Sequence, residues 1–407
     1  MPSPHDLNIS YLHSERTPLH IGVAILLEGV PDPVIVAHET EQLLELFPSL
    51  TFGEKSNITS EPSRYFSYQK LDYSITSENF ANITSSLAYG AFPKQGPLWR
   101  ISFAVSADKK TTACVFVIHH MLCDGLGVMQ IVHQLAQKTT NPETRNIKIS
   151  PQQQISDAPK QFPSLSDLAK VTNKGLTCNF RDKLSSSYDL TGANSSVRKF
   201  AFLPEIATTA ETGERSLTIK LLCAATSGLR NMLEECLIIP DFPANALLPI
   251  AINPLRRRRR LGNHFVSMPI SLPIHIEDID EQSLWLKNQL ISQLSDKKLQ
   301  STDRLFAALY RLPPYVQKYL FPWLCRKAAL HTTLIPASWL KKRSFFFSRR
   351  CLSIYPLLSP PPGMGLSFGV IFNGKSFLPS LTWDPKLIKD EKKLIGSFVN
   401  SCSRHLR

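Results

Sequence analysis

The sequence predicts an α/β protein of two domains. Three observations carry this prediction: the chain has 407 residues, strand-like and helix-like segments occur in both of its halves, and a long polar stretch separates them. A chain of this length buries two cores of ordinary domain size more readily than one. Hydrophobic residues make up 43% and charged residues 19% of the chain, values that exclude a disordered polymer.

The N-terminal part predicts a sheet with flanking helices. Alternating apolar residues predict strands, and apolar residues three and four positions apart predict helices. The predicted strands are 18–29, 99–105 and 111–118, and the predicted helices are 34–46 and 126–137. The last two strands form a hairpin across a polar turn. Residues 47–90 are polar, and no element is predicted there.

The C-terminal part repeats this mixture after a polar stretch. Residues 138–197 are rich in Gln, Ser, Pro, Asn and Lys without a sustained period, as linkers are. The predicted helices beyond them are 217–233 and 387–406, and the predicted extended segments are 247–252, 264–274 and 370–378. We therefore predict an N-terminal domain of residues 1–165, a linker of residues 166–196 and a C-terminal domain of residues 197–407.

The formal net charge of +13 favours an anionic partner, such as nucleic acid, a phosphorylated cofactor or an anionic membrane. One basic run is a candidate contact for the phosphates of coenzyme A, a nucleic-acid patch or a solvated loop. It consists of Arg256, Arg257, Arg258, Arg259 and Arg260. Because no nucleic-acid fold signature accompanies it, nucleic acid is not an expected partner.

A second basic region has no Asp or Glu between Arg304 and Thr382. In its first part, residues 305–327, Tyr, Phe, Trp and Leu alternate with Arg and Lys, as in helices that lie on anionic membranes. A core helix with a basic outer face is the other interpretation. Together with a basic cluster at residues 341–350, this region predicts peripheral attachment to a membrane or lipid droplet.

The eight cysteines form no Cys-x-x-Cys pair and no Cys/His cluster with zinc spacing, so no metal site is expected. Free cysteines in apolar runs favour a reducing compartment. We see no secretory signal and no stretch of ~18 to 20 apolar residues that would span a bilayer. The expected location is the cytoplasm, on the cytosolic face of the endoplasmic reticulum or plasma membrane.

The motif with the clearest chemistry follows the predicted strand 111–118. It reads His119-His120-Met121-Leu122-Cys123-Asp124-Gly125 and precedes an apolar helix. Acyl transfer from a thioester requires a base that removes the acceptor proton, and an imidazole has a pKa of ~6.5, close to working pH. The alternative is a capped turn with two buried, hydrogen-bonded histidines.

The supporting residues of the motif have distinct expected roles. Asp124 would pair with the imidazole or with a distant arginine that pins the loop, and Gly125 would let the chain fold tightly. The sequence contains no Gly-x-Ser-x-Gly elbow and no Gly-rich phosphate loop. We therefore expect direct transfer, without a covalent enzyme intermediate or a cofactor.

The His-His-x-x-x-Asp-Gly motif resembles that of the chloramphenicol acetyltransferase-like superfamily. Within it, four further segments resemble the wax ester synthase/diacylglycerol acyltransferase family. They are Glu15-Arg16-Thr17-Pro18-Leu19-His20-Ile21-Gly22, Gly96-Pro97-Leu98-Trp99-Arg100, Leu261-Gly262-Asn263, and the stretch from Tyr355-Pro356 through Gly365-Leu366-Ser367 to Asn373-Gly374.

The resemblance implies a fold and a reaction. It implies two related α/β subdomains with mixed sheets, a tunnel between them, and acyl-CoA and a lipid alcohol as the two substrates. His120 would be the base, Asp124 a structural residue, and Gly125 a site of close approach. His119 would support the motif.

The chain departs from the family pattern at two places. Lys220-Leu221 stands where the family usually has Asn-Asp, and no Ser-Asn-Val-Pro-Gly-Pro segment precedes Tyr355. Three hypotheses follow: an enzyme that makes wax esters or triacylglycerol, an enzyme of the same superfamily that acylates a small alcohol or amine, and a non-catalytic relative.

Overall fold

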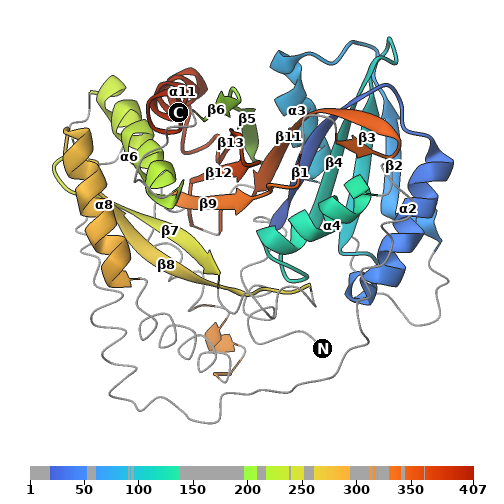
Figure 1. The fold of residues 1–407 in the computed structure, drawn as a ribbon, viewed down its shortest axis with the longest axis horizontal. Coiled ribbons are helices and arrows are strands. Elements are labelled where there is room, and N and C mark those ends of the chain that lie inside the picture. Colours follow the sequence, from blue (N-terminus) through green and yellow to red (C-terminus); the bar gives the residue numbers. More distant parts are fainter. Residues whose placement is uncertain are drawn as a thin grey trace.

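Two mixed β-sheets form the frame of the protein, and helices pack against both of them (Figure 1). The computed structural model describes residues 19–52, 61–89, 92, 96–137, 197–208, 217–237, 240–251, 261–293, 312–313, 315–317, 319, 330–340, 344–361 and 363–407. Within these residues the predicted α/β class is confirmed. The domain limits predicted at residues 165 and 197 stay a prediction, because the linker lies outside the described residues.

The first sheet has the strand order β10-β11-β1-β4-β3-β2. Its strands are β1 (His20–Glu28), β2 (Phe66–Lys70), β3 (Trp99–Val105), β4 (Thr111–His119), β10 (Phe345–Phe346) and β11 (Arg349–Leu358). β2 runs parallel to β3, while the pairs β10–β11, β11–β1, β1–β4 and β4–β3 are antiparallel. The first predicted strand and the predicted hairpin are thus confirmed.

The second sheet has the order β5-β13-β12-β9-β7-β8, with β6 beside β13. Its strands are β5 (Lys199–Phe202), β6 (Ile206–Ala207), β7 (Ala244–Ala251), β8 (Phe265–Leu272), β9 (Leu330–Pro336), β12 (Leu366–Phe372) and β13 (Ser376–Trp383). The central strand β9 is parallel to both β7 and β12, and the other pairs are antiparallel. β7 and β8 confirm two of the predicted extended segments.

The helices cover the sheets in separate groups (Figure 1). They are α2 (Pro33–Leu46), α3 (Ser77–Ala88), α4 (Gly125–Gln137), α6 (Leu217–Glu235), α8 (Ile279–Gln293) and α11 (Glu391–His405), with short 3-10 turns at Pro48–Thr51 and Pro62–Tyr65. Side chains of α2 and α4 share a core with one face of the first sheet, and α3 packs on its other face. The helices α6, α8 and α11 share a second core with the second sheet.

Local chemistry explains where several helices begin. The Asp32 side chain accepts the Val34 N–H at the start of α2, with Pro33 in the first turn. Thr76 and Asn79 form a reciprocal capping box at the start of α3. This helix lies inside residues 47–90, where no element was predicted. The prediction was wrong there because the capping residue is Asn instead of the usual Glu or Gln, and the apolar runs are short.

One predicted segment divides into two strands. Residues 370–378 were expected to be one extended segment, but β12 ends at Phe372 and β13 begins at Ser376. The side chain of Asn373 accepts the N–H groups of Lys375 and Ser376, and Gly374 has a φ of 89°. These residues make a tight turn, in which glycine adopts the left-handed conformation without strain.

β11 is the strand at which the two sheets meet. It pairs with β1 in the first sheet, although its neighbours in the sequence belong mostly to the second. Its Leu358 side chain occupies the position that a side chain at Gly369 of β12 would need. Ser380 of β13 donates a hydrogen bond to the carbonyl of Pro356 at 2.7 Å. Packing and hydrogen bonding through β11 therefore hold one sheet against the other.

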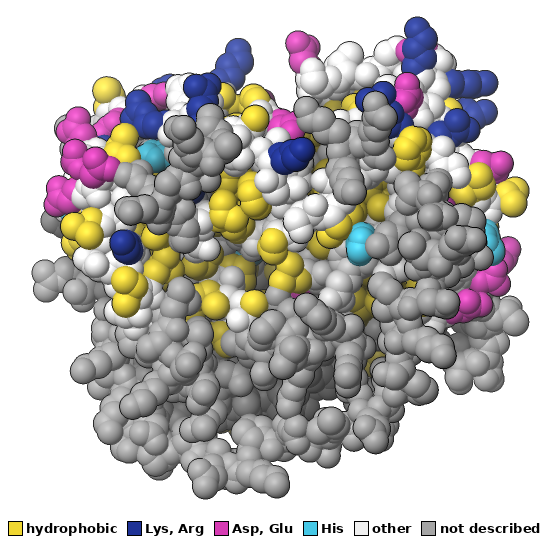
Figure 2. Space-filling view, viewed as in Figure 1, with side chains coloured by type: hydrophobic (Ala, Val, Ile, Leu, Met, Phe, Trp, Pro, Cys, Tyr) yellow, Lys and Arg dark blue, Asp and Glu magenta, His cyan; other side chains and the backbone are white. Residues whose placement is uncertain are grey.

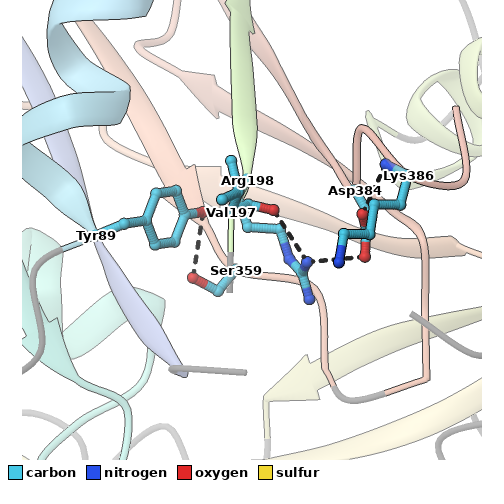
Figure 3. A network of polar contacts seen from close by, with 6 residues as sticks. All are labelled: Tyr89, Val197, Arg198, Ser359, Asp384 and Lys386. Carbon is cyan, nitrogen blue, oxygen red and sulfur yellow. Dashed lines mark hydrogen bonds and ion pairs between the residues drawn. The ribbon is translucent and has the colours of Figure 1, made fainter. Parts of the chain in front are cut away.

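Buried polar contacts lie near the end of this strand, where Ser359 follows β11 (Figure 3). The Arg198 guanidinium donates to the Asp384 carboxylate at 3.1 Å, and both side chains are about 98% or more buried. Ser359, which follows β11, lies 3.5 Å from the Tyr89 hydroxyl, and burial raises the pKa of Tyr89 above its ordinary value. The contact of Tyr89 with Ser359 joins residues that follow α3 and β11, and the pair of Arg198 and Asp384 joins residues that flank β5 and β13.

We expect Asp384→Asn to lower the free energy of unfolding by about 3 to 5 kcal/mol, because it removes the charge opposite a buried guanidinium. Urea denaturation would measure this loss. The matched control is Glu391→Gln, which breaks an ion pair with Lys199 whose side chains are 44% and 46% exposed. Exposed pairs contribute roughly 0 to 1 kcal/mol. Equal losses in the two variants would contradict the structural role of the buried pair.

Candidate active site

The histidine motif forms the connection between β4 and α4. His119 is the last residue of β4 and Gly125 is the first residue of α4. The backbone of this loop is fixed by neighbours on both sides: His119 N–H donates to the Leu98 carbonyl at 2.7 Å, and His120 N–H donates to the Leu19 carbonyl at 3.0 Å. A strand-to-helix turn was expected here, and the structure confirms it.

His120 faces Asn263, which lies just before β8 of the second sheet. The Nδ1 atom of His120 is 3.0 Å from the Asn263 Oδ1 atom. The Asn263 amide nitrogen donates to the His120 carbonyl at 2.8 Å and to the Met121 carbonyl at 3.3 Å. Asn263 is 3% exposed, so these bonds form away from bulk water.

These contacts determine the tautomer of His120. The two backbone carbonyls only accept hydrogen bonds, so the amide nitrogen of Asn263 must point at them and its oxygen must point at the imidazole. An oxygen acceptor requires a proton on Nδ1 of His120. The lone pair of the neutral ring is then on Nε2, where it can accept a proton.

Asp124 connects the motif loop to the segment that carries Asn263. Its Oδ1 atom accepts the Gly127 N–H at 2.9 Å, and its Oδ2 atom accepts the His264 N–H at 3.1 Å. The Asp124 N–H donates to the Gly262 carbonyl at 3.2 Å. The carboxylate thus caps α4 and binds the neighbouring loop through backbone N–H groups.

The other motif residues shape the turn. His119 is buried, and its Nδ1 atom accepts the Met121 N–H at 3.1 Å. A side chain at Gly125 would lie 3.3 Å from Ile335 of β9, so glycine allows β9 to approach the start of α4. The role of Gly125 in the reaction stays a prediction.

A second histidine, His331 on β9, interacts electrostatically with His120. Burial, together with the positive charge of His120, lowers the pKa of His331 from 6.5 to about 4. His331 is therefore neutral at neutral pH. It follows that the imidazole of His120 can accept a proton while the imidazole of His331 stays uncharged.

The arginine run and the Lys220-Leu221 pair were also singled out in the sequence. The five arginines 256–260 lie outside the described residues. Lys220 and Leu221, which replace the family's Asn-Asp, are buried on α6. Lys220 donates to the carbonyl of Arg407 at 2.8 Å, and Leu221 packs in the second core. These two residues therefore support the packing of the C-terminal helix.

Sequence reasoning missed Asn263 and His331 as site residues. The Leu261-Gly262-Asn263 segment was noted as a resemblance, but its distance from the motif in the sequence gave no reason to pair Asn263 with His120. His331 lies on β9, a strand that was not predicted. β9 lies in the stretch between Arg304 and Thr382, which was noted for its lack of Asp and Glu.

Residues 71–198 match the family model described as the wax ester synthase/diacylglycerol acyltransferase catalytic domain. This match contains the histidine motif. The fold with its two mixed sheets is similar to that of solved wax ester synthase/diacylglycerol acyltransferase and condensation-domain structures. The resemblance found in the sequence is confirmed, and family match and fold together indicate an acyltransferase.

Three solved structures illustrate the likeness. The wax ester synthase/diacylglycerol acyltransferase from Marinobacter aquaeolei VT8 has a TM-score of 0.62 at 14% identity, over 98% of this chain and 97% of that chain. A mutant starter condensation domain of the rhizomide synthetase RzmA, in complex with C8-CoA, has a TM-score of 0.65 at 14% identity. The match covers 99% of this chain and 94% of that chain.

The third structure is the epimerization domain from the third module of tyrocidine synthetase B. It has a TM-score of 0.58 at 14% identity, over 100% of this chain and 95% of that chain. At these identities the likeness establishes the fold. No curated protein matches this chain by sequence.

Two further observations concern the described part of the chain. None of its helices is long and apolar enough to cross a bilayer. Within the same residues, no three His, Cys, Asp or Glu side chains lie together in a way that could hold a metal ion. That the reaction needs neither a metal nor a cofactor stays a prediction.

We expect Asn263→Leu to change the tautomer of His120, because leucine provides no acceptor for the Nδ1 proton. Nuclear magnetic resonance of the imidazole nitrogens would show the proton on Nδ1 in the original protein and distributed over both nitrogens in the variant. Asn263→Asp keeps an oxygen acceptor and should restore the Nδ1 proton. An unchanged tautomer in Asn263→Leu would contradict the assigned role.

Proposed function

We propose that the protein transfers a fatty acyl group from acyl-CoA to the hydroxyl of a lipid alcohol. A long-chain alcohol would give a wax ester, and diacylglycerol would give triacylglycerol. The observation that carries the proposal is the contact of His120 Nδ1 with Asn263, which leaves the lone pair on Nε2. The family match at residues 71–198 and a structural neighbour in complex with C8-CoA support it.

In the proposed reaction, Nε2 of His120 accepts the proton of the acceptor hydroxyl while the hydroxyl oxygen attacks the thioester carbonyl. The tetrahedral intermediate then collapses and its carbon–sulfur bond breaks. The departing sulfur takes the proton from the imidazolium, so free coenzyme A and an ester are the products. Protein groups do not form a covalent bond to the acyl group, and no cofactor takes part.

The remaining motif residues act on geometry in this proposal. Asp124 and Asn263 fix the loop and the imidazole before the substrates bind, which reduces the cost of orienting the base. Arg256 to Arg260 would bind the phosphates of coenzyme A, because the guanidinium group matches phosphate oxygens. The sequence supports this contact through the position of the run directly before Leu261.

A second candidate is acylation of a small alcohol or an amine from a free or protein-bound thioester. The likeness to condensation domains favours it. A non-catalytic relative is the third candidate, motivated by the missing Ser-Asn-Val-Pro-Gly-Pro segment. Thiol release separates the third candidate from the first two, and the identity of the product separates the first from the second.

We expect His120→Ala to lower kcat by ~10²- to 10⁴-fold, because it removes the general base. The assay would follow thiol release from acyl-CoA with a panel of long-chain alcohol, diacylglycerol, small alcohols and amines, with product analysis. The matched control is His38→Ala, since His38 is exposed on α2. Full activity in His120→Ala would refute the mechanism.

We also propose that the protein binds peripherally to a cytosolic membrane face or a lipid droplet, where lipid acceptors are found. Two tyrosines of the predicted interfacial segment are strongly exposed, Tyr315 at 68% and Tyr319 at 75%. On α8, Leu284 and Ile291 are 57% and 66% exposed, seven residues apart and thus on one face. In Figure 2, hydrophobic side chains lie between the more charged outer regions of the described surface.

Liposome flotation would test this attachment. We expect more protein to float with anionic vesicles than with neutral ones, because basic residues are attracted to anionic lipid. The double variant Tyr315→Ser/Tyr319→Ser should float less, because aromatic side chains anchor at the membrane interface. Val34→Ser is the control, since Val34 is 75% exposed on α2, outside the predicted segment. Equal recovery from both vesicles would contradict membrane binding.

A further inference from the structure

The inward face of the second sheet carries polar side chains that the proposed mechanism does not use. On β9, Leu330 packs in the core with α6, whereas Ile335 packs in the core of the first sheet. Side chains alternate along a strand, so His331 shares the face of Ile335. This face of β9 is the one turned toward the first sheet and the histidine motif.

The side chains of the neighbouring strand β12 are divided between the same two faces of the sheet. Its Phe368 belongs to the core with α6, and Ile371 belongs to the core of the first sheet. Ser367 is on the face of Ile371. The strand register pairs Ser367 with His331 on β9 and with Thr382 on β13. Three polar side chains therefore form a row across adjacent strands, ~4.8 Å apart from strand to strand.

Two of these side chains have unused hydrogen-bonding groups. Among the described residues, neither the Nδ1 atom of His331 nor the hydroxyl of Ser367 has a hydrogen-bond partner, and both atoms are buried. Ser367 is 1% exposed. Most buried polar groups are paired, and a buried group without a partner costs roughly 1 to 3 kcal/mol. Two such groups side by side indicate a place where a ligand supplies the missing partner.

Other described residues with unpaired buried atoms differ in their position. Thr332 and Ser397, for example, have unpaired hydroxyls. Thr332 is on the β9 face that packs with α6, and Ser397 is on the buried side of α11. Thr332 and Ser397 are on different elements and do not form a pair. His331 and Ser367 are neighbours on adjacent strands, and His331 interacts with His120.

The chemistry of the pair restricts the ligand atom. His331 is neutral at neutral pH, because burial and the charge of His120 lower its pKa. It therefore does not compete with His120 for the acceptor proton. A hydroxyl and a neutral imidazole both offer a hydrogen-bond donor to an uncharged oxygen. An acyl carbonyl is such an oxygen, and it becomes negative when the thioester is attacked.

We propose that His331 and Ser367 bind the carbonyl oxygen of the acyl thioester and donate hydrogen bonds to it. The inference rests on the proposed acyl transfer, and it names the groups that stabilise the negative oxygen of the intermediate. Ser367 donates its O–H and His331 its Nδ1–H. Neither residue exchanges a proton or forms a covalent bond, so the reaction remains balanced as written above.

Steady-state kinetics with octanoyl-CoA would test the pair. We expect Ser367→Ala and His331→Leu each to lower kcat by ~10²- to 10³-fold, the loss found when one donor to an oxyanion is removed. KM should change little. His331→Gln retains a donor and should recover part of the activity. Thr332→Val removes a similar unpaired hydroxyl from the opposite face of β9 and should leave kcat unchanged.

A binding measurement without acceptor makes the test independent of turnover. Calorimetry would compare octanoyl-CoA with the thioether S-octyl-CoA, which lacks the carbonyl. The original protein should bind the thioester about 2- to 10-fold more tightly, the ratio given by one net hydrogen bond. This preference should fall in Ser367→Ala and in His331→Leu, each of which removes one of the two donors. Folding of the variants is checked by urea denaturation, in which loss of an unpaired hydroxyl should be nearly neutral.

The outcomes separate this inference from the proposed function. If His120→Ala is inactive while Ser367→Ala and His331→Leu keep full kcat, the inference is overturned and acyl transfer stands. Equal binding of thioester and thioether by the original protein also overturns it. Absence of both binding and thiol release with every acyl-CoA overturns the inference together with the proposed function.

Discussion

The contact between His120 and Asn263 is the interaction on which the candidate site depends. One amide group spans the two sheets: its oxygen faces Nδ1 of the imidazole, and its nitrogen binds the carbonyls of His120 and Met121. The same contact fixes the loop and the tautomer. A hydrogen bond to a neutral ring is modest in energy, but here it selects which nitrogen carries the lone pair.

The contact between His120 and Asn263 forms only if the two sheets keep a fixed distance. The packing of the strands around β11 maintains this distance. β11 pairs with β1 while its side chains contact β12 and β13. Within the second sheet, the buried pair of Arg198 and Asp384 joins residues next to the neighbouring strands β5 and β13. Replacing a buried ion pair with apolar residues is often tolerated, whereas removing one partner is costly.

Local patterns predicted the elements that bury one continuous apolar face. The strands β1, β3 and β4 and the helices α2, α4 and α6 have such faces, and their residue ranges followed from spacing alone. Elements with weak local signals were not predicted. The helix α3 begins with an unusual capping box, and β9 has threonines among its apolar residues. Such elements are stabilised by the sheets and cores that surround them.

For the site, the sequence by itself determined the motif, which runs from His119 to Gly125, and its place between a strand and a helix. The role of an imidazole as the base is a proposal. Only the tertiary structure decided that Asn263, far along the chain, meets His120, and that His331 and Ser367 are neighbours. The physical reason is that periodicity reports which face of an element is apolar. It does not report which faces meet, because strand order and packing between sheets depend on contacts distant in sequence.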